Sequence, residues 1–147
     1  MSVLRRVVFD TSSLVGAALQ VGSVPHRALS VALGMGDVCA SEATLTELSE
    51  VMQRPKFNRF QTLEIRQAFV ALMRSHAHLF AVSQADEAAV LPACRDPKDN
   101  KFLALAKACG AHVLVSSDAD LQVLSPWNGM PIVSPADFLA LVRPAQE

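Results

Sequence analysis

The sequence contains little charge and no excess of either sign. Its 147 residues carry a net charge of −1, and charged residues make up 18% of the chain. Proteins that attract nucleic acid through their whole surface have a large excess of Lys and Arg over Asp and Glu. That mode of binding is excluded here, so any contact with nucleic acid must come from a local basic patch and from bound metal ions.

Cysteine is also scarce, and its spacing excludes two common uses. Cys39, Cys94 and Cys109 form no Cys-x-x-Cys pair, and their number is odd. The four histidines show no metal-ligand spacing with these cysteines, which argues against a zinc site. Disulfide frameworks are typical of small secreted proteins with paired cysteines. We therefore expect three buried, reduced thiols in a cytoplasmic protein.

Long apolar runs and targeting patterns are missing as well. The apolar stretch after Arg5 and Arg6 is interrupted at Asp10, so it does not match a signal peptide. No run reaches the roughly 20 apolar residues that a membrane-spanning helix requires. Apolar residues still make up 51% of the chain, which is typical of a globular core. We predict one soluble, cytoplasmic domain over residues 1–147, with no membrane partner.

The basic residues concentrate in two short segments. Each segment could serve as a local phosphate-binding patch, and each could equally be an ordinary solvated helix surface. Both interpretations stay open at this point. The two groups are Arg54, Lys56, Arg59 and Arg66, and Arg95, Lys98 and Lys101.

Short apolar runs alternate with amphipathic segments along the whole chain. The former are typical of buried strands and the latter of helices. This alternation, with short connections, predicts an α/β chain whose parallel sheet is covered by helices on both faces. We expect strands at 7–9, 38–40, 79–82, 112–115 and 132–133, and helices at 14–19, 25–34 or 25–36, 41–52, from 62 onwards, 97–109 and 136–142.

Capping residues mark one of these helices clearly. Asp96 is the candidate N-cap, Pro97 fits the first helical position, and Gly110 fits the end. An Asp in the first turn, here Asp99, favours the helix dipole by about 0.3–1 kcal/mol. That explanation is needed for only one of the two acids around Pro97. We therefore expect one of them to cap the helix and the other to point elsewhere.

The helices near 63–73 and 138–142 carry more apolar surface than one small sheet needs. Excess apolar surface marks an interaction site, and a two-fold dimer is the commonest solution. We therefore expect self-association through these helices. In the first of them, the side that faces the core is predicted to contain Leu63, Ile65, Phe69, Leu72 and Met73.

Two acidic residues follow predicted strands. Asp10 ends the strand at 7–9, and Asp118 comes shortly after the strand at 112–115. The carboxyl ends of parallel strands meet at one edge of a sheet, where open α/β folds bind their ligands. Asp10 could instead cap the following helix. A Ser or Thr cap would avoid burying a charge, however, which favours a functional role for Asp10.

Glu47 and Asp99 lie in predicted helices. Glu47 would be an ordinary exposed residue, except that Leu45, Leu48 and Val51 should face the core and place it at the border of the buried face. Several carboxylates that meet in one place repel one another, so their pKa values rise or divalent cations neutralise them. Ligands that are all oxygen atoms select hard cations such as Mg²⁺ or Mn²⁺.

Taken together and in order, these motifs resemble those of PIN-domain nucleases. Two segments, RPKF and RDP, resemble more specifically the bacterial PIN proteins grouped as VapC-like toxins of toxin–antitoxin systems. The resemblance covers nearly the whole chain, at similar spacing. The motifs are VFDTS at 8–12, TLTEL at 44–48, RPKF at 54–57, RDPKDN at 95–100, FLALA at 102–106 and LVSSDADL at 114–121.

The resemblance implies a three-layer α/β/α sandwich that binds one or two Mg²⁺ or Mn²⁺ ions and cleaves RNA by metal-activated water. It also implies a homodimer and a small antitoxin as partner. Arg54, Lys56 and Arg59 would contact RNA phosphates in a groove between the paired sites. The catalytic and metal-binding residues that it implies are Asp10, Glu47, Asp99 and Asp118, with Ser12, Asp96, Ser116 and Asp120 in supporting positions.

Two other functions remain open. A phosphatase or phosphotransfer domain can be built on a similar sheet, but aspartyl phosphatases carry Asp-x-Asp after the first strand, and here the second position is Ser12. Receiver domains carry an adjacent acidic pair, whereas Asp10 stands alone. A non-catalytic binding module would keep the fold without the metal. Mg²⁺-dependent RNA cleavage that is lost in Asp10→Asn separates a nuclease from all of these.

Overall fold

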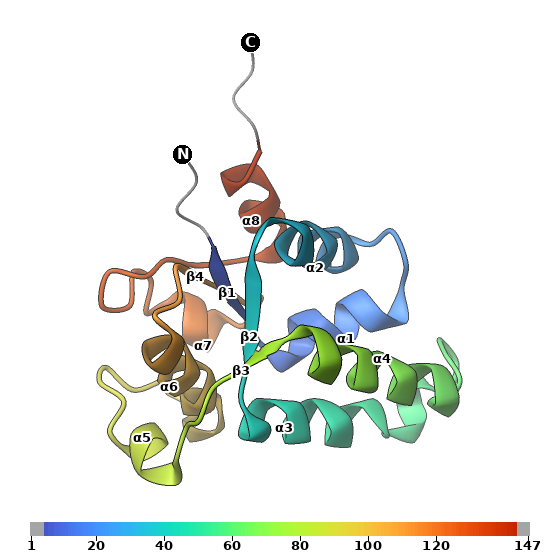
Figure 1. Cartoon of the computed structure of the whole chain (residues 1–147), viewed down its shortest axis with the longest axis horizontal. Helices are drawn as coiled ribbons and strands as arrows, with labels where there is room; N and C mark the ends of the chain where they lie inside the picture. Colours follow the sequence, from blue (N-terminus) through green and yellow to red (C-terminus); the bar gives the residue numbers. More distant parts are fainter. Residues whose placement is uncertain (1–4, 144–147) are drawn as a thin grey trace.

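Five short strands form one sheet in which all neighbouring strands run parallel (Figure 1). The computed structural model describes residues 5–143. The order of the strands across the sheet is β3-β2-β1-β4-β5. The predicted strand at 79–82 begins one residue earlier and ends at Leu79, and the other predicted strands are confirmed to within a residue or two. The strands are β1 (Arg6–Phe9), β2 (Asp37–Ala40), β3 (His78–Leu79), β4 (Val113–Val115) and β5 (Ile132–Val133).

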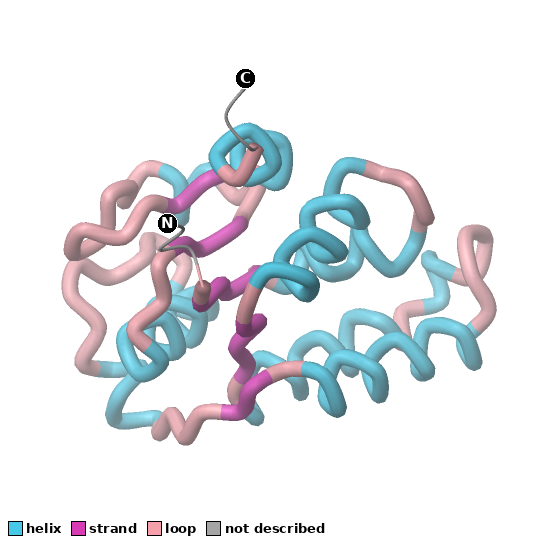
Figure 2. The backbone as a smooth tube through the Cα atoms, turned by 45° about the horizontal axis from the view of Figure 1, so that its top comes forward, coloured by secondary structure: helices cyan, strands magenta, loops and turns pink. Residues whose placement is uncertain are grey.

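Helices cover both faces of the sheet, which gives the predicted α/β/α sandwich (Figure 2). One layer contains α1 (Thr11–Leu19), α2 (Val24–Met35), α3 (Glu42–Met52), α4 (Leu63–His76) and α8 (Pro135–Leu141). The other contains α5 (Gln84–Ala88), α6 (Asn100–Cys109) and α7 (Ala119–Gln122), and two 3₁₀ turns, η1 (Pro55–Phe57) and η2 (Pro97–Asp99), precede α4 and α6.

The strands alternate their side chains between two separate apolar cores. In β1, Val7 and Phe9 pack with the layer of α1, α2 and α3, while Val8 packs with α6. In β4, Val115 and Leu114 divide in the same way. Burial on both faces is what a central parallel strand requires, and it explains the continuous apolar runs in the sequence.

Local signals in the sequence set the helices that later carry the site. Ser41 caps α3, and its hydroxyl accepts a hydrogen bond from the Thr44 amide at 3.2 Å. Asp96 caps η2, and its carboxylate accepts from the Lys98 amide at 3.0 Å. Gly110 ends α6 with a φ of 63°, a left-handed conformation that glycine adopts without strain.

The sequence predicted five residues on the buried side of α4, and this prediction is wrong for three of them. Leu63, Ile65 and Leu72 are 43%, 51% and 52% exposed, and Met73 is the predicted residue that is fully buried. The physical reason is position, because α4 packs against α3 and α1 at the outside of its layer. Only a narrow stripe of it is covered, and that stripe includes Arg66. Arg66 therefore fits neither of the two interpretations left open for its basic group, a phosphate-binding patch or a solvated helix surface.

Two expectations about composition can also be compared with the structure. Cys39, Cys94 and Cys109 are buried and free, as predicted. Within residues 5–143 there is no helix with the length and apolar character needed to cross a membrane.

Candidate active site

Asp10 lies at the carboxyl end of β1, where the strand passes into α1. Its side chain is 4% exposed and accepts hydrogen bonds from the Ser13 amide at 2.9 Å and from the Ser116 hydroxyl at 2.5 Å. Burial raises the pKa of Asp10, and the hydrogen bonds from Ser116, Ser13 and Ser12 oppose this rise. Asp10 therefore caps α1 and also places a buried carboxylate at the edge of the sheet.

Ser116 connects the ends of two neighbouring strands. It follows β4 directly and is completely buried. Its hydroxyl donates to Asp10 and accepts from the Asp118 amide at 2.9 Å. Because one hydroxyl serves both residues, the orientation of the Asp10 carboxylate is coupled to the turn that carries Asp118.

Asp99 ends η2 and precedes α6, and its side chain caps neither element. Asp96 provides the cap, so the expectation that one acid caps and the other points elsewhere is confirmed. Burial, followed by the neighbouring Asp118 carboxylate, raises the pKa of Asp99 to about 7. Asp96 and Glu47 add smaller effects in the same direction. Asp99 and Asp118 therefore lie close enough to repel each other.

Glu47 lies half-buried on α3, at the border of the core as predicted. The Lys101 ammonium donates to one of its oxygens at 2.5 Å, and the Thr11 hydroxyl donates to the other. Sequence reasoning missed both partners. Thr11 directly follows Asp10, and this adjacency was an available signal, whereas Lys101 is brought to Glu47 only by the packing of α6 beside α3.

One cavity of about 870 Å³ collects these side chains. Its lining includes the four candidate metal ligands, which come from four separate segments, and Ser12. The four are Asp10, Glu47, Asp99 and Asp118. The other three supporting candidates, Asp96, Ser116 and Asp120, lie outside its lining, as does Arg59. Basic residues also line the cavity, and they are Arg54, Lys56, Lys98 and Lys101.

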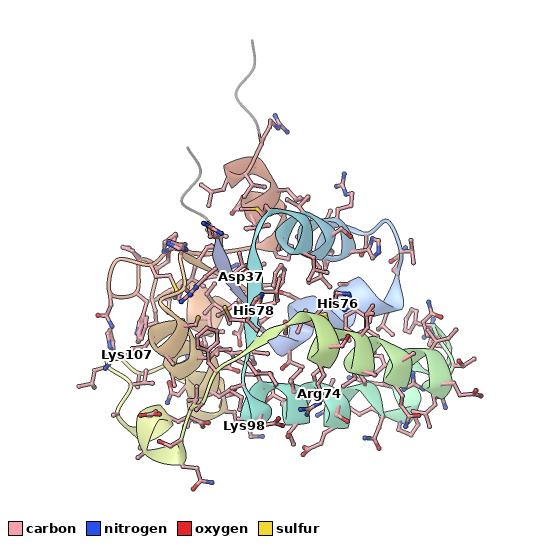
Figure 3. The ribbon with its side chains drawn as sticks, viewed as in Figure 1. Asp37, Arg74, His76, His78, Lys98 and Lys107 are labelled. Carbon is pink, nitrogen blue, oxygen red and sulfur yellow. The ribbon has the colours of Figure 1, made fainter. Side chains whose placement is uncertain are left out.

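Glu42 also lines the cavity, but its charge is already compensated. Arg74 extends from α4 toward α3 (Figure 3), and its guanidinium pairs with Glu42 at 2.7 Å. The hydrogen bond from Arg74 lowers the pKa of Glu42. This exposed pair forms part of the rim. Glu50 also lines the cavity and is exposed, and the remaining acids are Asp10, Glu47, Asp99 and Asp118.

The oxygen atoms of the four candidate ligands are of the chemical type that binds a hard divalent cation. All four candidate ligands are carboxylates, and the pKa of Asp99 shows a repulsion that a cation would relieve. Within residues 5–143, no three Asp, Glu, His or Cys side chains are arranged so that they could hold a metal ion as they stand. The two Glu47 oxygens each accept one hydrogen bond, from Thr11 and from Lys101, so a bound metal ion would share this carboxylate with both donors.

Comparison with known proteins points to one family. The model of a family described as PIN domain matches residues 6–120, which include the four candidate metal ligands. No curated protein is detectably similar in sequence.

Several solved structures share the fold at low sequence identity. VapBC2 from Rickettsia felis, solved bound to a promoter DNA fragment, is 13% identical with a TM-score of 0.61, covering 86% of this chain and 96% of the other. VapC20 from Mycobacterium tuberculosis, a toxin that cleaves the sarcin-ricin loop, is 16% identical with a TM-score of 0.56, covering 81% and 95%. PAE2754 from Pyrobaculum aerophilum is 12% identical with a TM-score of 0.59, covering 95% and 91%.

Proposed function

We propose that this chain, which belongs to the PIN domain family, is a Mg²⁺- or Mn²⁺-dependent endoribonuclease that acts in the cytoplasm. The observation that supports this most directly is the cavity where acids from four distant segments meet beside basic residues. These basic residues, Arg54, Lys56, Lys98 and Lys101, are called the basic wall below. Carboxylates alone would repel an RNA phosphate. A site that gathers both signs of charge suits a metal ion on one side and the RNA backbone on the other.

Asp10, Glu47, Asp99 and Asp118 are the residues that would hold the metal. A bound ion of this kind lowers the pKa of a water molecule and neutralises negative charge on the phosphate. The chain itself contributes a fixed Asp10 carboxylate, which Ser13 and Ser116 orient. The start of α6, next to Asp99, adds partial positive charge beside the cavity.

The basic wall would hold the RNA strand. Arg54 and Lys56 line the cavity together with Lys98, which supports a role for them in contacting RNA phosphates near the cleaved bond. Arg59 lies outside the lining and stacks on the exposed Phe60 ring at 5.1 Å, so it would contact the strand further from the cut. Unpaired RNA suits such a wall, because its backbone can follow a surface.

Purified protein and labelled single-stranded RNA provide the direct test. We expect cleavage that requires Mg²⁺ or Mn²⁺, stops with chelator, and leaves 5′-phosphate and 3′-hydroxyl ends. Binding of RNA without cleavage under any divalent cation would support a non-catalytic module. Release of inorganic phosphate from a phosphomonoester, without RNA cleavage, would support a phosphatase.

Two neighbouring acids give a matched test of the site. Asp118 lines the cavity and Asp120 does not, although both lie in the same turn. We expect Asp118→Asn to lower kcat by about 10²-fold or more, since a ligand of the metal is weakened. An Asn can still accept the hydrogen bond from the Asp120 amide, so the cap of α7 is kept. Asp120→Asn, with the same change in charge, should stay within about twofold of wild type, and equal losses in both would contradict this assignment.

Toxin activity under the control of a small antitoxin is part of the proposal. Among the structures that share the fold, VapC20 is a toxin, and VapBC2 was solved bound to a DNA fragment from its promoter. For this chain, a small DNA-binding protein encoded next to it would be the partner. Growth arrest on expression, relieved by co-expression of that neighbour, is the expected result.

A homodimer is also proposed. Leu63, Ile65 and Leu72 expose apolar surface on α4, which is the kind of surface that a partner covers. The second predicted face contributes less, because Phe138 is completely buried against Phe9. We expect light scattering at micromolar concentration to give twice the 15.8 kDa chain mass, and Leu72→Glu to shift the protein toward monomer. A monomeric wild-type protein would contradict the dimer but not the nuclease.

A further inference from the structure

Arg66 is a charged side chain that is completely buried, with 0% of its surface exposed. Arginine is almost never fully buried unless a partner compensates its charge. Among residues 5–143, no Asp or Glu forms an ion pair with it. The guanidinium therefore requires another explanation than a buried salt bridge.

Its partners are neutral oxygen atoms at the two ends of one loop. Arg66 donates to the Met52 carbonyl at 2.5 Å, to the Arg54 carbonyl at 3.1 Å and to the Gln61 carbonyl at 3.2 Å. It also donates to the side-chain oxygen of Asn58. Met52 is the last residue of α3, and carbonyls at a helix C-terminus carry partial negative charge that stabilises a cation.

The loop at 53–62 has one apolar contact with the core, made by the partly covered Phe57. None of its ten residues is buried, and Phe57 and Gln61 are only partly covered. Arg66, four residues into α4, is the buried side chain beneath it. The loop is thus held by the partial packing of Phe57 and by four hydrogen bonds from one buried guanidinium.

This loop carries two of the four basic residues that line the candidate active site, Arg54 and Lys56. Arg54, Lys56 and Phe57 line the cavity with the four acids. We propose that Arg66 is a positioning residue that fixes this part of the basic wall for the RNA strand, an inference that rests on the proposed ribonuclease function. Arg66 would act only through the loop, because it does not itself line the cavity.

The planar guanidinium is essential to this role. Its donors point in several fixed directions and reach four acceptors at once, whereas a lysine ammonium is a single point on a flexible chain. Arg66→Lys therefore keeps the buried charge near the end of α3 but releases part of the loop. Asn58→Ala removes one acceptor by a change at an exposed position and leaves the core untouched.

Steady-state cleavage of a single-stranded RNA oligonucleotide tests the proposal. We expect Arg66→Lys to raise KM about 10-fold, equivalent to about 1.4 kcal/mol of binding, with kcat within about twofold. The slope of log KM against log salt should fall by roughly 0.7 for each phosphate that the wall no longer neutralises. Asn58→Ala should change KM in the same direction by a smaller factor. In a Lys56→Glu background the effect of Arg66→Lys should shrink, because both residues act through the same part of the wall.

The control is Phe138→Leu, a core substitution in α8 away from the cavity. It should lower the melting temperature without changing KM. An Arg66→Lys protein with wild-type KM and salt dependence would overturn the proposal and leave Arg66 as a structural residue only. If that variant fails to fold, Asn58→Ala decides, and an unchanged KM there overturns it equally. Absence of cleavage by the wild-type protein would instead refute the proposed function itself.

Discussion

Asp10→Asn is expected to abolish RNA cleavage while leaving the fold intact. Asp10 is the most buried of the four acids and is oriented by Ser13 and Ser116. Replacing its charge removes an anionic metal ligand, and a metal ion contributes several kcal/mol of transition-state stabilisation. That corresponds to a loss of about 10³-fold in kcat. Activity should not return at higher Mg²⁺, because the remaining carboxylates lack the fixed position of Asp10.

Stability should respond in a different way. The Asn side chain retains an oxygen that accepts from the Ser13 amide, so the cap of α1 persists. Burial disfavours the ionised carboxylate of Asp10, and its neutral replacement avoids that cost. We expect a melting temperature, without metal, equal to or slightly above wild type. Asp10→Ala is the matched comparison, since it loses the cap at a cost of about 1 kcal/mol.

The two variants together separate the roles of Asp10. Calorimetry and cleavage assays should show both inactive, with Asp10→Ala less stable than Asp10→Asn. A large drop in the melting temperature of Asp10→Asn, measured without metal, would mean that the carboxylate serves the fold. Retained cleavage in Asp10→Asn would contradict the metal-ligand role outright.

The sheet and the position of the acids could be predicted because both depend on local sequence. An apolar, β-branched run such as the one at 7–9 has few alternatives to a buried strand, and a residue that follows it must lie at the sheet edge. Pro97 and Gly110 similarly mark the two ends of a helical segment. Parallel pairing then brings Asp10 and Asp118 to the same edge without further information.

Features that depend on the packing of one helix against another could not be predicted. The pairing of Lys101 with Glu47 joins α6 to α3 across the cavity, and nothing in either helix indicates it. The burial of Arg66 depends on the loop folding over α4, and basic residues are usually exposed. Leu63 and Ile65 were expected inside because a helical pattern records which residues are apolar, not how much of the helix a neighbour covers.

The contacts that could not be predicted also affect the candidate site. The four acids and Ser116 were expected at the site, but the two partners of Glu47, a hydroxyl and an ammonium, were not. Thr11 and Lys101 hold Glu47, and Ser116 holds Asp10. These contacts decide how the site is organised before metal arrives, and they arise only in the folded chain.

Asp99→Asn should stabilise the metal-free protein and remove part of its pH dependence. Burial and the Asp118 carboxylate raise the pKa of Asp99 from 3.8 to about 7. Above pH 7 the folded protein carries the ionised form of Asp99, which lowers the free energy of unfolding. This loss is recovered as the pH falls from 7 toward 4. Asp99 is partly exposed, so solvent screening reduces the effect to about 1 kcal/mol.

Thermal unfolding without metal at several pH values provides the measurement. For a chain of this size, about 1 kcal/mol corresponds to roughly 3–5 °C. We expect Asp99→Asn to melt that much higher than wild type at pH 8. The difference should shrink as the pH falls and vanish below pH 3.8, where the wild-type carboxyl is protonated in the unfolded state as well. A difference that is constant with pH would show that Asp99 affects stability by some means other than its charge.

Addition of Mg²⁺ should reverse the order of the two proteins. A ligand that binds only the folded state stabilises it by about 2.7 kcal/mol at 100 times its Kd. Wild-type protein, with all four carboxylates, should gain most of this, whereas Asp99→Asn should gain little and lose cleavage by about 10³-fold. The carboxylate repulsion that weakens the metal-free fold would then be the feature that gives the site its affinity for a cation. Equal Mg²⁺ stabilisation of both proteins would remove Asp99 from the metal site.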